Sequence, residues 1–282
     1  MKVASGISTM NSLCVLCVSL LFSIQSFAQP DRLPVEETYK RVDTVRLSMV
    51  IYKPDNFKKT ERYPAIVFFF GGGWIDGNRN QFKTFAEHFA SRGMFSVLVD
   101  YRVKTRHGTT PFESLKDAKS AIRYLRKNAG RFGIDAQRIV ASGGSAGGHL
   151  AAACYTNESI NEESDDPGIS SKPNALVLFN PVIDNSKQGY GYDRIGERYL
   201  EFSPLHNITK GFPPTVFFLG TKDKLIPVST AKLFKEKIES LDGRCDLFLY
   251  EDQGHGFFNQ KIFHEDILSK VDAFLQSIGY LN

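Results

Sequence analysis

The sequence has little of what marks several other classes of protein. Only 4 of its 282 residues are cysteine, too few for a disulfide scaffold at this length. Its 35 basic and 31 acidic residues include no basic block, whereas nucleic-acid-binding proteins usually carry a clustered basic face. We therefore expect no nucleic-acid partner. With 42% hydrophobic and 23% charged residues and no internal repeat, the chain is typical of a globular protein with a large core.

The N-terminal apolar run is too short to span a membrane. Residues 13–24 form a run of 12 residues without a charge, whereas a spanning helix needs about 20 apolar residues and a signal-peptide core about 7–15. Ser26 and Ala28 then place small residues just before a cut at Gln29. These features predict a signal peptide over residues 1–28, export to the periplasm or beyond, and no stable membrane anchor. An uncleaved anchor is the alternative.

Short apolar runs recur along the rest of the chain and predict strands that are buried on both faces. The runs are residues 65–70, 94–99, 138–141, 175–179, 215–219 and 245–250. Before them, Val45, Leu47, Met49 and Ile51 alternate with other residues, which predicts a half-exposed strand. We expect it to pair antiparallel with residues 39–42.

Apolar residues recur at helical spacing between two of these runs and again after the last one. This spacing predicts helices at residues 114–128 and 263–278, with Gly133 and Asp135 breaking the chain before the next strand. Strands that alternate with helices predict the α/β class, with a mostly parallel central sheet covered by helices on both faces.

Two long segments lack periodicity, residues 157–173 and 184–211, and both are long enough to be functional loops. No linker composition separates them from the remainder, so we predict a single domain over residues 29–282.

One glycine-rich turn has the pattern of a nucleophile elbow. Gly143-x-Ser145-x-Gly147 lies between a predicted strand and a predicted helix, which is the context that this pattern requires. A serine on so sharp a turn needs small neighbours, because side chains there would strike the strand and the helix. The alternative is a glycine-rich helix start that binds phosphate or only packs closely.

A second glycine turn, Gly71-Gly72-Gly73-Trp74, follows the most apolar run. Glycines let backbone N–H groups turn towards a substrate oxygen. We predict that the N–H groups of Gly72, Gly73 and Ala146 form an oxyanion hole. An ordinary tight turn is the alternative.

A nucleophilic serine needs a base, which an acid orients. His255 lies between two glycines just past the last predicted strand and is the favoured base among six histidines. The others lie in predicted helices or polar loops: His88, His107, His149, His206 and His264. Asp223 follows the strand before it and is the favoured acid, with Glu251 and Asp252 as competitors. The order Ser145, Asp223, His255 is that of one hydrolase fold.

Four stretches carry a resemblance to a known family. They are Phe69-Phe70-Gly71-Gly72-Gly73-Trp74, residues 143–150, Gly220-Thr221-Lys222-Asp223 and Gly254-His255-Gly256-Phe257. Through them, residues 63–281 resemble the catalytic core of the α/β-hydrolase superfamily. Within it the chain is similar to secreted bacterial esterases and lipases, including hormone-sensitive-lipase-like carboxylesterases and, above all, bifunctional acetylxylan and feruloyl esterases. Phe70 stands where the lipase-like group usually has His.

The resemblance implies a secreted serine carboxylesterase that needs no cofactor and acts on short-chain or aromatic esters, with acetylated or feruloylated polysaccharide as the expected substrate. Trp74, Tyr190 and Tyr192 are candidates to stack on sugar or feruloyl rings; alternatively, Trp74 supports the glycine turn and the tyrosines form an exposed loop. A prolyl-oligopeptidase-like peptidase and a catalytically silent binding module are the alternative functions. No metal-site spacing stands out, and the sequence leaves open whether Cys154 and Cys245 pair.

Overall fold

The computed structural model describes residues 33–282 together with Met1 and Gly6. The predicted signal peptide, residues 1–28, lies outside the described residues except for those two positions. Residues 33–282 group as one compact unit. Among residues 33–282, no helix combines the length and the apolarity that crossing a membrane requires.

The centre of the molecule is a sheet of eight strands in the order β1-β2-β4-β3-β5-β6-β7-β8. The strands are β1 (Val35–Val42), β2 (Val45–Tyr52), β3 (Tyr63–Phe69), β4 (Phe95–Val99), β5 (Ile134–Gly144), β6 (Ala175–Phe179), β7 (Thr215–Gly220) and β8 (Cys245–Tyr250). β1 and β2 pair antiparallel, and β2 meets β4 antiparallel. All the other neighbours are parallel. The predicted fold class and the N-terminal strand pair are therefore confirmed.

The apolar runs form strands because both faces of the sheet are covered. In β3, Val67 packs into a core on one face and Phe68 into a core on the other. Every residue of β4 and β6 is buried, whereas the edge strand β1 mixes exposed, half-buried and buried residues. One expectation is wrong: Asp135 does not break the chain, because β5 already begins at Ile134. The break falls on Gly133, whose φ of 90° favours glycine.

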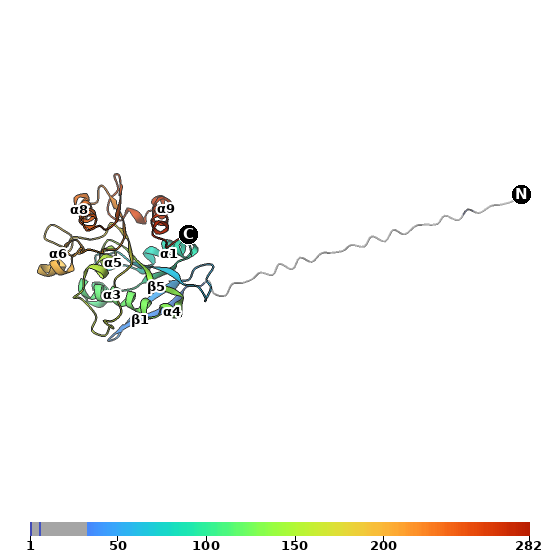
Figure 1. Ribbon diagram of the computed structural model, residues 1–282, viewed down its shortest axis with the longest axis horizontal. Helices are drawn as coiled ribbons and strands as arrows, with labels where there is room; N and C mark the ends of the chain where they lie inside the picture. The colour runs from blue at the N-terminus through green and yellow to red at the C-terminus, as the bar shows by residue number, and fades with distance from the viewer. Residues whose placement is uncertain (2–5, 7–32) are drawn as a thin grey trace. The chain divides into compact units, whose positions relative to one another are not determined.

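The helices divide between the two faces of the sheet. They are α1 (Lys83–Ser91), α2 (Lys104–His107), α3 (Pro111–Lys127), α4 (Ala129–Phe132), α5 (Ala146–Thr156), α6 (Tyr192–Ile195), α7 (Tyr199–Phe202), α8 (Val228–Glu239) and α9 (Lys261–Ser277). Residues of α3, α5 and α8 belong to one core, and residues of α1 and α9 belong to the other. In Figure 1, α1 and α9 accordingly lie side by side. The two predicted long helices correspond to α3 and α9.

The two long aperiodic segments differ in structure. The segment from Asn157 to Pro173 contains no helix or strand. The segment from 184 to 211 holds α6, α7 and the 3₁₀ turns Gly196–Arg198 and Pro204–His206. Cys154 on α5 and Cys245 at the start of β8 are both buried free thiols, so the structure contains no disulfide between them.

Candidate active site

Ser145 occupies a strained turn between β5 and α5. β5 ends at Gly144 and α5 begins at Ala146, which leaves Ser145 alone at the junction with φ 53° and ψ −118°. A residue other than glycine rarely adopts a positive φ. Backbone strain of this kind is concentrated at functional sites. Neighbouring backbone holds the turn, because the Ser145 N–H donates to the Phe179 carbonyl at 2.9 Å and its carbonyl accepts from the Val182 N–H at 3.1 Å.

The glycines around Ser145 are required by close backbone contacts. A Cβ on Gly143 would lie 2.4 Å from the carbonyl carbon of Gly147. A Cβ on Gly147 would lie 2.0 Å from the carbonyl oxygen of Phe69, and one on Gly144 would lie 2.4 Å from the Phe258 ring. Each distance is far below van der Waals contact. α5 therefore packs against β3 and β5 only because Gly143 and Gly147 lack side chains, and the Phe258 ring packs on the end of β5 only because Gly144 does.

The structure brings the side chains of Ser145, His255 and Asp223 into one hydrogen-bonded chain. Ser145 Oγ lies 2.9 Å from His255 Nε2, and His255 Nδ1 lies 2.7 Å from Asp223 Oδ2. His255 lies in the loop after β8 and Asp223 follows β7, at the carboxyl edge of the parallel sheet where ligands of such folds bind.

The surroundings of Asp223 fix how the imidazole is protonated. The Asp223 side chain has no exposed surface, and its Oδ1 accepts from the N–H groups of Leu225 and Ile226 at 2.8 and 3.0 Å. Its Oδ2 is therefore the oxygen that faces His255, where only an N–H can satisfy it. This places the proton on Nδ1 and leaves Nε2 to accept the Ser145 hydroxyl hydrogen.

The competing acids that follow β8 lie elsewhere. Asp252 is exposed and pairs with Lys222 at 2.7 Å, and Glu251 is exposed as well. Of the predicted alternative bases, His149 is fully buried on α5, and burial lowers its pKa to about 3. It packs against Phe202 and stays neutral. Within the described residues, no cluster of three or more His, Cys, Asp or Glu side chains could hold a metal ion.

The predicted oxyanion turn lies directly against Ser145. A Cβ on Gly71 would lie 3.0 Å from the Gly144 carbonyl oxygen and 3.5 Å from Ser145 Cβ. Gly72 and Gly73 have φ values of 128° and 65°, which turn the backbone sharply. In the described part of the chain, no protein group accepts a hydrogen bond from the N–H groups of Gly72, Gly73 or Ala146. These donors therefore remain free for a substrate oxygen.

The structure contradicts the expectation that Trp74 stacks on a substrate ring. Its side chain is only 1% exposed and packs edge-on against His149 and Phe202. Trp74 thus supports the glycine turn, which is the alternative that the sequence left open. Side chains from α5 and from the segment after β6 cover the indole, and this long-range packing leaves no local pattern in the sequence.

Tyr190 and Tyr192 are half-buried, and they have different neighbours. The Tyr190 hydroxyl would lie 3.0 Å from a Cβ on Gly73, so Tyr190 borders the oxyanion turn. The Tyr192 hydroxyl donates instead to Glu197. Arg194 was not anticipated from the sequence; its Nη1 donates to the Gly73 carbonyl at 2.7 Å and its guanidinium lies 4.8 Å from the centre of the Tyr190 ring.

Two amide side chains near the site were also missed. Asn180 directly follows β6 and lies 3.3 Å from His255 Nε2, so its position just past a strand was the available signal. Gln81 accepts from the Gly71 N–H at 2.7 Å and donates to Asn259 at 3.1 Å. No sequence signal singles out Gln81.

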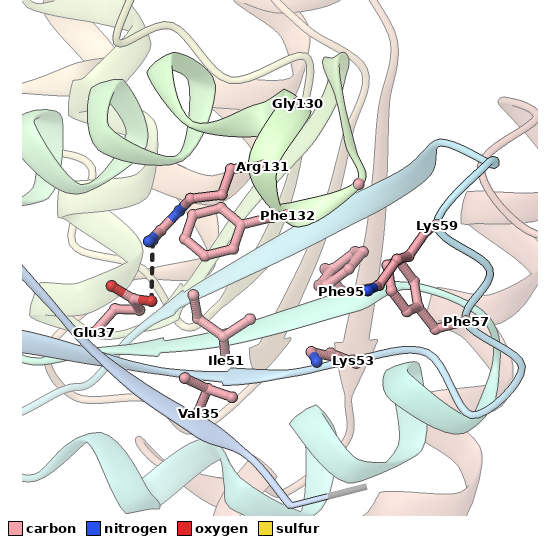
Figure 2. Close-up of a pocket in the computed structure, with 11 residues that line it drawn as sticks. Val35, Glu37, Ile51, Lys53, Phe57, Lys59, Phe95, Gly130, Arg131 and Phe132 are labelled. Atoms are coloured by element: carbon pink, nitrogen blue, oxygen red, sulfur yellow. Dashed lines mark ion pairs between the residues drawn. The ribbon is translucent and has the colours of Figure 1, made fainter. Parts of the chain in front are cut away.

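A separate pocket of about 390 Å³ lies among the residues drawn in Figure 2. Its lining includes Phe95, the first residue of β4, and Gly133, just before β5. The pocket therefore lies at the amino-terminal edge of the parallel strands, opposite the edge that carries Ser145. Arg131 and Glu37 form an ion pair of 3.0 Å beside it (Figure 2).

Comparisons with known proteins show what the chain as a whole is similar to. The BD-FAE family model matches residues 49–191, and the Dienelactone hydrolase family model matches residues 185–281. Among solved structures, the chain is similar to an esterase of Thermogutta terrifontis with propionate bound. The identity is 42%, the match covers 88% of this chain and 95% of that one, and the TM-score is 0.84.

Curated proteins give more distant matches. The chain is 29% identical over 238 residues to a probable isoprenylcysteine alpha-carbonyl methylesterase of Arabidopsis thaliana, covering 76% of this chain and 49% of that protein. It is 26% identical over 175 residues to endo-1,4-beta-xylanase B of Butyrivibrio fibrisolvens, covering 58% of this chain and 28% of that protein. The chain thus spans about half the length of the first curated relatives that it matches.

Proposed function

Because this chain belongs to the BD-FAE family of the α/β-hydrolase superfamily, we propose that it is a carboxylesterase that works through an acyl-serine intermediate. The observation that carries the proposal is the hydrogen-bonded chain from Ser145 through His255 to Asp223. A serine hydroxyl is a poor nucleophile at neutral pH unless an adjacent base removes its proton. The free N–H groups beside Ser145 supply the second requirement, which is a site for the charge that develops on the ester oxygen.

Acylation starts when Ser145 Oγ attacks the carbonyl carbon of the ester and its proton passes to His255 Nε2. The tetrahedral oxyanion binds the N–H groups of Gly72, Gly73 and Ala146. When the intermediate collapses, the bond between carbon and the alcohol oxygen breaks, and the Nε2 proton goes to that oxygen. The alcohol leaves, and the acyl group stays on Ser145.

Deacylation repeats these steps with water. Water attacks the acyl carbon and gives a proton to His255 Nε2, and the C–Oγ bond of Ser145 then breaks. This proton from water passes on to Oγ, which releases the carboxylic acid and restores the enzyme. Throughout, Asp223 holds the imidazole and stabilises its positive charge without taking a proton.

The mechanism is tested by Ser145→Ala, with Ser142→Ala as the matched control. Ser142 lies in β5 three residues earlier, is fully buried and has no hydrogen-bond partner among the described residues. We expect Ser145→Ala to abolish hydrolysis of p-nitrophenyl acetate above background, whereas Ser142→Ala keeps it. Undiminished hydrolysis by Ser145→Ala contradicts the proposal.

We infer that the substrates are acetyl or feruloyl esters on polysaccharide. The propionate bound to the Thermogutta esterase supports a small acyl group, and the likeness to a xylanase supports a carbohydrate alcohol. Half-exposed Tyr190 beside the oxyanion turn is the candidate to contact a substrate ring. Mass spectrometry of acetylated and feruloylated xylo-oligosaccharides would reveal the released acid, and release of neither acid contradicts this choice.

We further propose that residues 1–28 direct export and are removed. The support is the short uncharged run of residues 13–24, followed by small residues before Gln29. Mass spectrometry of the exported protein should find Gln29 at its N-terminus. An exported protein that still begins at Met1 contradicts cleavage.

A further inference from the structure

Asn180 combines burial, strain and contact with the proposed catalytic base. It follows directly on β6, is fully buried and has a φ of 34°. Its N–H donates to the Phe218 carbonyl at 2.7 Å, and the preceding carbonyl, that of Phe179, accepts from the Ser145 N–H. The strained backbone of Asn180 is therefore locked to β7 on one side and to the nucleophile turn on the other.

The carboxamide of Asn180 connects two parts of the histidine loop. Its Oδ1 accepts from the Gly256 N–H at 3.1 Å, and its Nδ2 lies 3.3 Å from His255 Nε2. Only the oxygen of an amide can accept the Gly256 hydrogen. The contact with Gly256 consequently fixes the rotamer in which the NH₂ group faces Nε2.

This contact matters most after Ser145 has been acylated. In the free enzyme, the imidazole is held at Nδ1 by Asp223 and at Nε2 by the Ser145 hydroxyl and Asn180. In the acyl-enzyme, Oγ is an ester oxygen and has no hydrogen to donate. Asp223 and Asn180 then remain as the partners that hold the imidazole where Nε2 can take a proton from the water that attacks the acyl carbon.

We propose that Asn180 is a positioning residue for His255 and that its effect falls mainly on deacylation. This role rests on the proposed acyl-serine mechanism. It goes beyond that mechanism because it makes deacylation depend on the Asn180 side chain more strongly than acylation does. A purely structural Asn180 would instead influence both half-reactions through the stability of the loop.

The chain offers a matched control for the structural role. Asn259 Nδ2 donates to the Gly256 carbonyl at 2.9 Å, so it restrains the same residue through its carbonyl group. Its hydrogen bonds go to Gly256 and Gln81 and leave the imidazole untouched. Asn259→Ala therefore loosens the histidine loop without removing a partner of Nε2.

The informative variant is Asn180→Gly, because glycine adopts a positive φ without strain and the change removes only the carboxamide. Asn180→Ala removes the same group but keeps the backbone strain. A lower melting temperature for Asn180→Ala than for Asn180→Gly therefore reports the strain separately from the role of the side chain.

Stopped-flow measurement of p-nitrophenol release from p-nitrophenyl acetate gives the acylation rate from the burst and the deacylation rate from the steady state.

In Asn180→Gly we expect deacylation to slow about tenfold, the scale of one lost hydrogen bond, while acylation stays within about twofold. The values of kcat and KM then fall together. Asn259→Ala should leave the ratio of the two rates unchanged. Equal slowing of both steps in Asn180→Gly, or no slowing, overturns the role of Asn180. If the wild type shows no hydrolysis that Ser145→Ala removes, the proposed function itself fails, and the two failures are thus distinguishable.

Discussion

Replacing Asp223 with asparagine tests the proposed mechanism at the contact that the structure defines most tightly. The substitution keeps the shape of the side chain and removes its charge. The oxygen at the Oδ1 position must still accept from the N–H groups of Leu225 and Ile226, at 2.8 and 3.0 Å, and only the amide oxygen can do so. The NH₂ group of the substituted side chain is therefore forced to face His255 Nδ1.

This forced orientation reverses the protonation of the imidazole. A donor facing Nδ1 requires Nδ1 to be the bare nitrogen, so the proton moves to Nε2. His255 Nε2, which lies 2.9 Å from Ser145 Oγ, then cannot accept the hydroxyl hydrogen. We expect kcat to fall about 10⁴-fold, as for the corresponding change in a serine protease. This equals a loss of about 5 kcal/mol of transition-state stabilisation.

The assay is steady-state hydrolysis of p-nitrophenyl acetate, with Asp252→Asn as the matched control. Asp252 is an exposed acid near His255 in sequence, and it pairs with Lys222 at 2.7 Å on the surface. Such a pair contributes about 0–1 kcal/mol, so Asp252→Asn should keep kcat within about twofold. A variant Asp223→Asn that retains a tenth of the activity, or a severe loss in Asp252→Asn, refutes the assignment of the acid.

Three further predictions concern stability and accessibility. Gly147→Ala places a Cβ 2.0 Å from a β3 carbonyl oxygen and should lower the free energy of unfolding by about 1–3 kcal/mol in urea titrations; Gly130→Ala, where nothing lies within 4 Å, should not, and equal effects contradict the steric argument. Trp74→Ala should cost about 3–5 kcal/mol because the ring is buried; a change in KM without loss of melting temperature would instead indicate substrate contact. Burial raises the pKa of the Cys154 and Cys245 thiols to about 12, so neither should react with Ellman's reagent at neutral pH until the protein unfolds; rapid reaction of either in the folded protein contradicts its burial.

Local patterns predicted most of the fold because the hydrophobicity of a short run of residues largely determines whether it forms a buried strand. A run such as 175–179 reads as a buried strand whatever lies around it, and β6 has those bounds. The ends of β5 were harder to place, because Asp135 and Gln137 are polar and yet lie inside the strand. Pairing with Tyr63 and Ala65 of β3 extends it, and the hydrophobic pattern of β5 alone does not contain that information.

The expectations for substrate contacts depended on long-range packing, and there the sequence was less informative. Trp74 and Tyr190 lie far apart along the chain, and yet their rings lie 6.2 Å from centre to centre. The segment that includes Phe202 folds back over the glycine turn and buries the indole. Nothing within the glycine turn itself distinguishes a buried aromatic residue from an exposed one, because the residues that cover it come from α5 and from the segment after β6.

The sheet order explains why four chemically different residues meet. β5, β6, β7 and β8 are consecutive both along the chain and across the sheet, and they are parallel. The residues that follow them therefore reach the same edge: Ser145 after β5, Asn180 after β6, Asp223 after β7 and His255 after β8. The residue types expected of a nucleophile, an acid and a base follow β5, β7 and β8. The amide that follows β6 neither takes nor gives a proton in this chemistry, so its residue type does not single it out. Ser145 and Asn180 both have a positive φ. The backbone is therefore strained just after β5 and just after β6, the two strands whose following residues contact His255 Nε2. In an unstrained turn after β6, the side chain of Asn180 would point in a different direction and would not reach His255. The backbone geometry of this turn, and not only its residue type, therefore determines the contact.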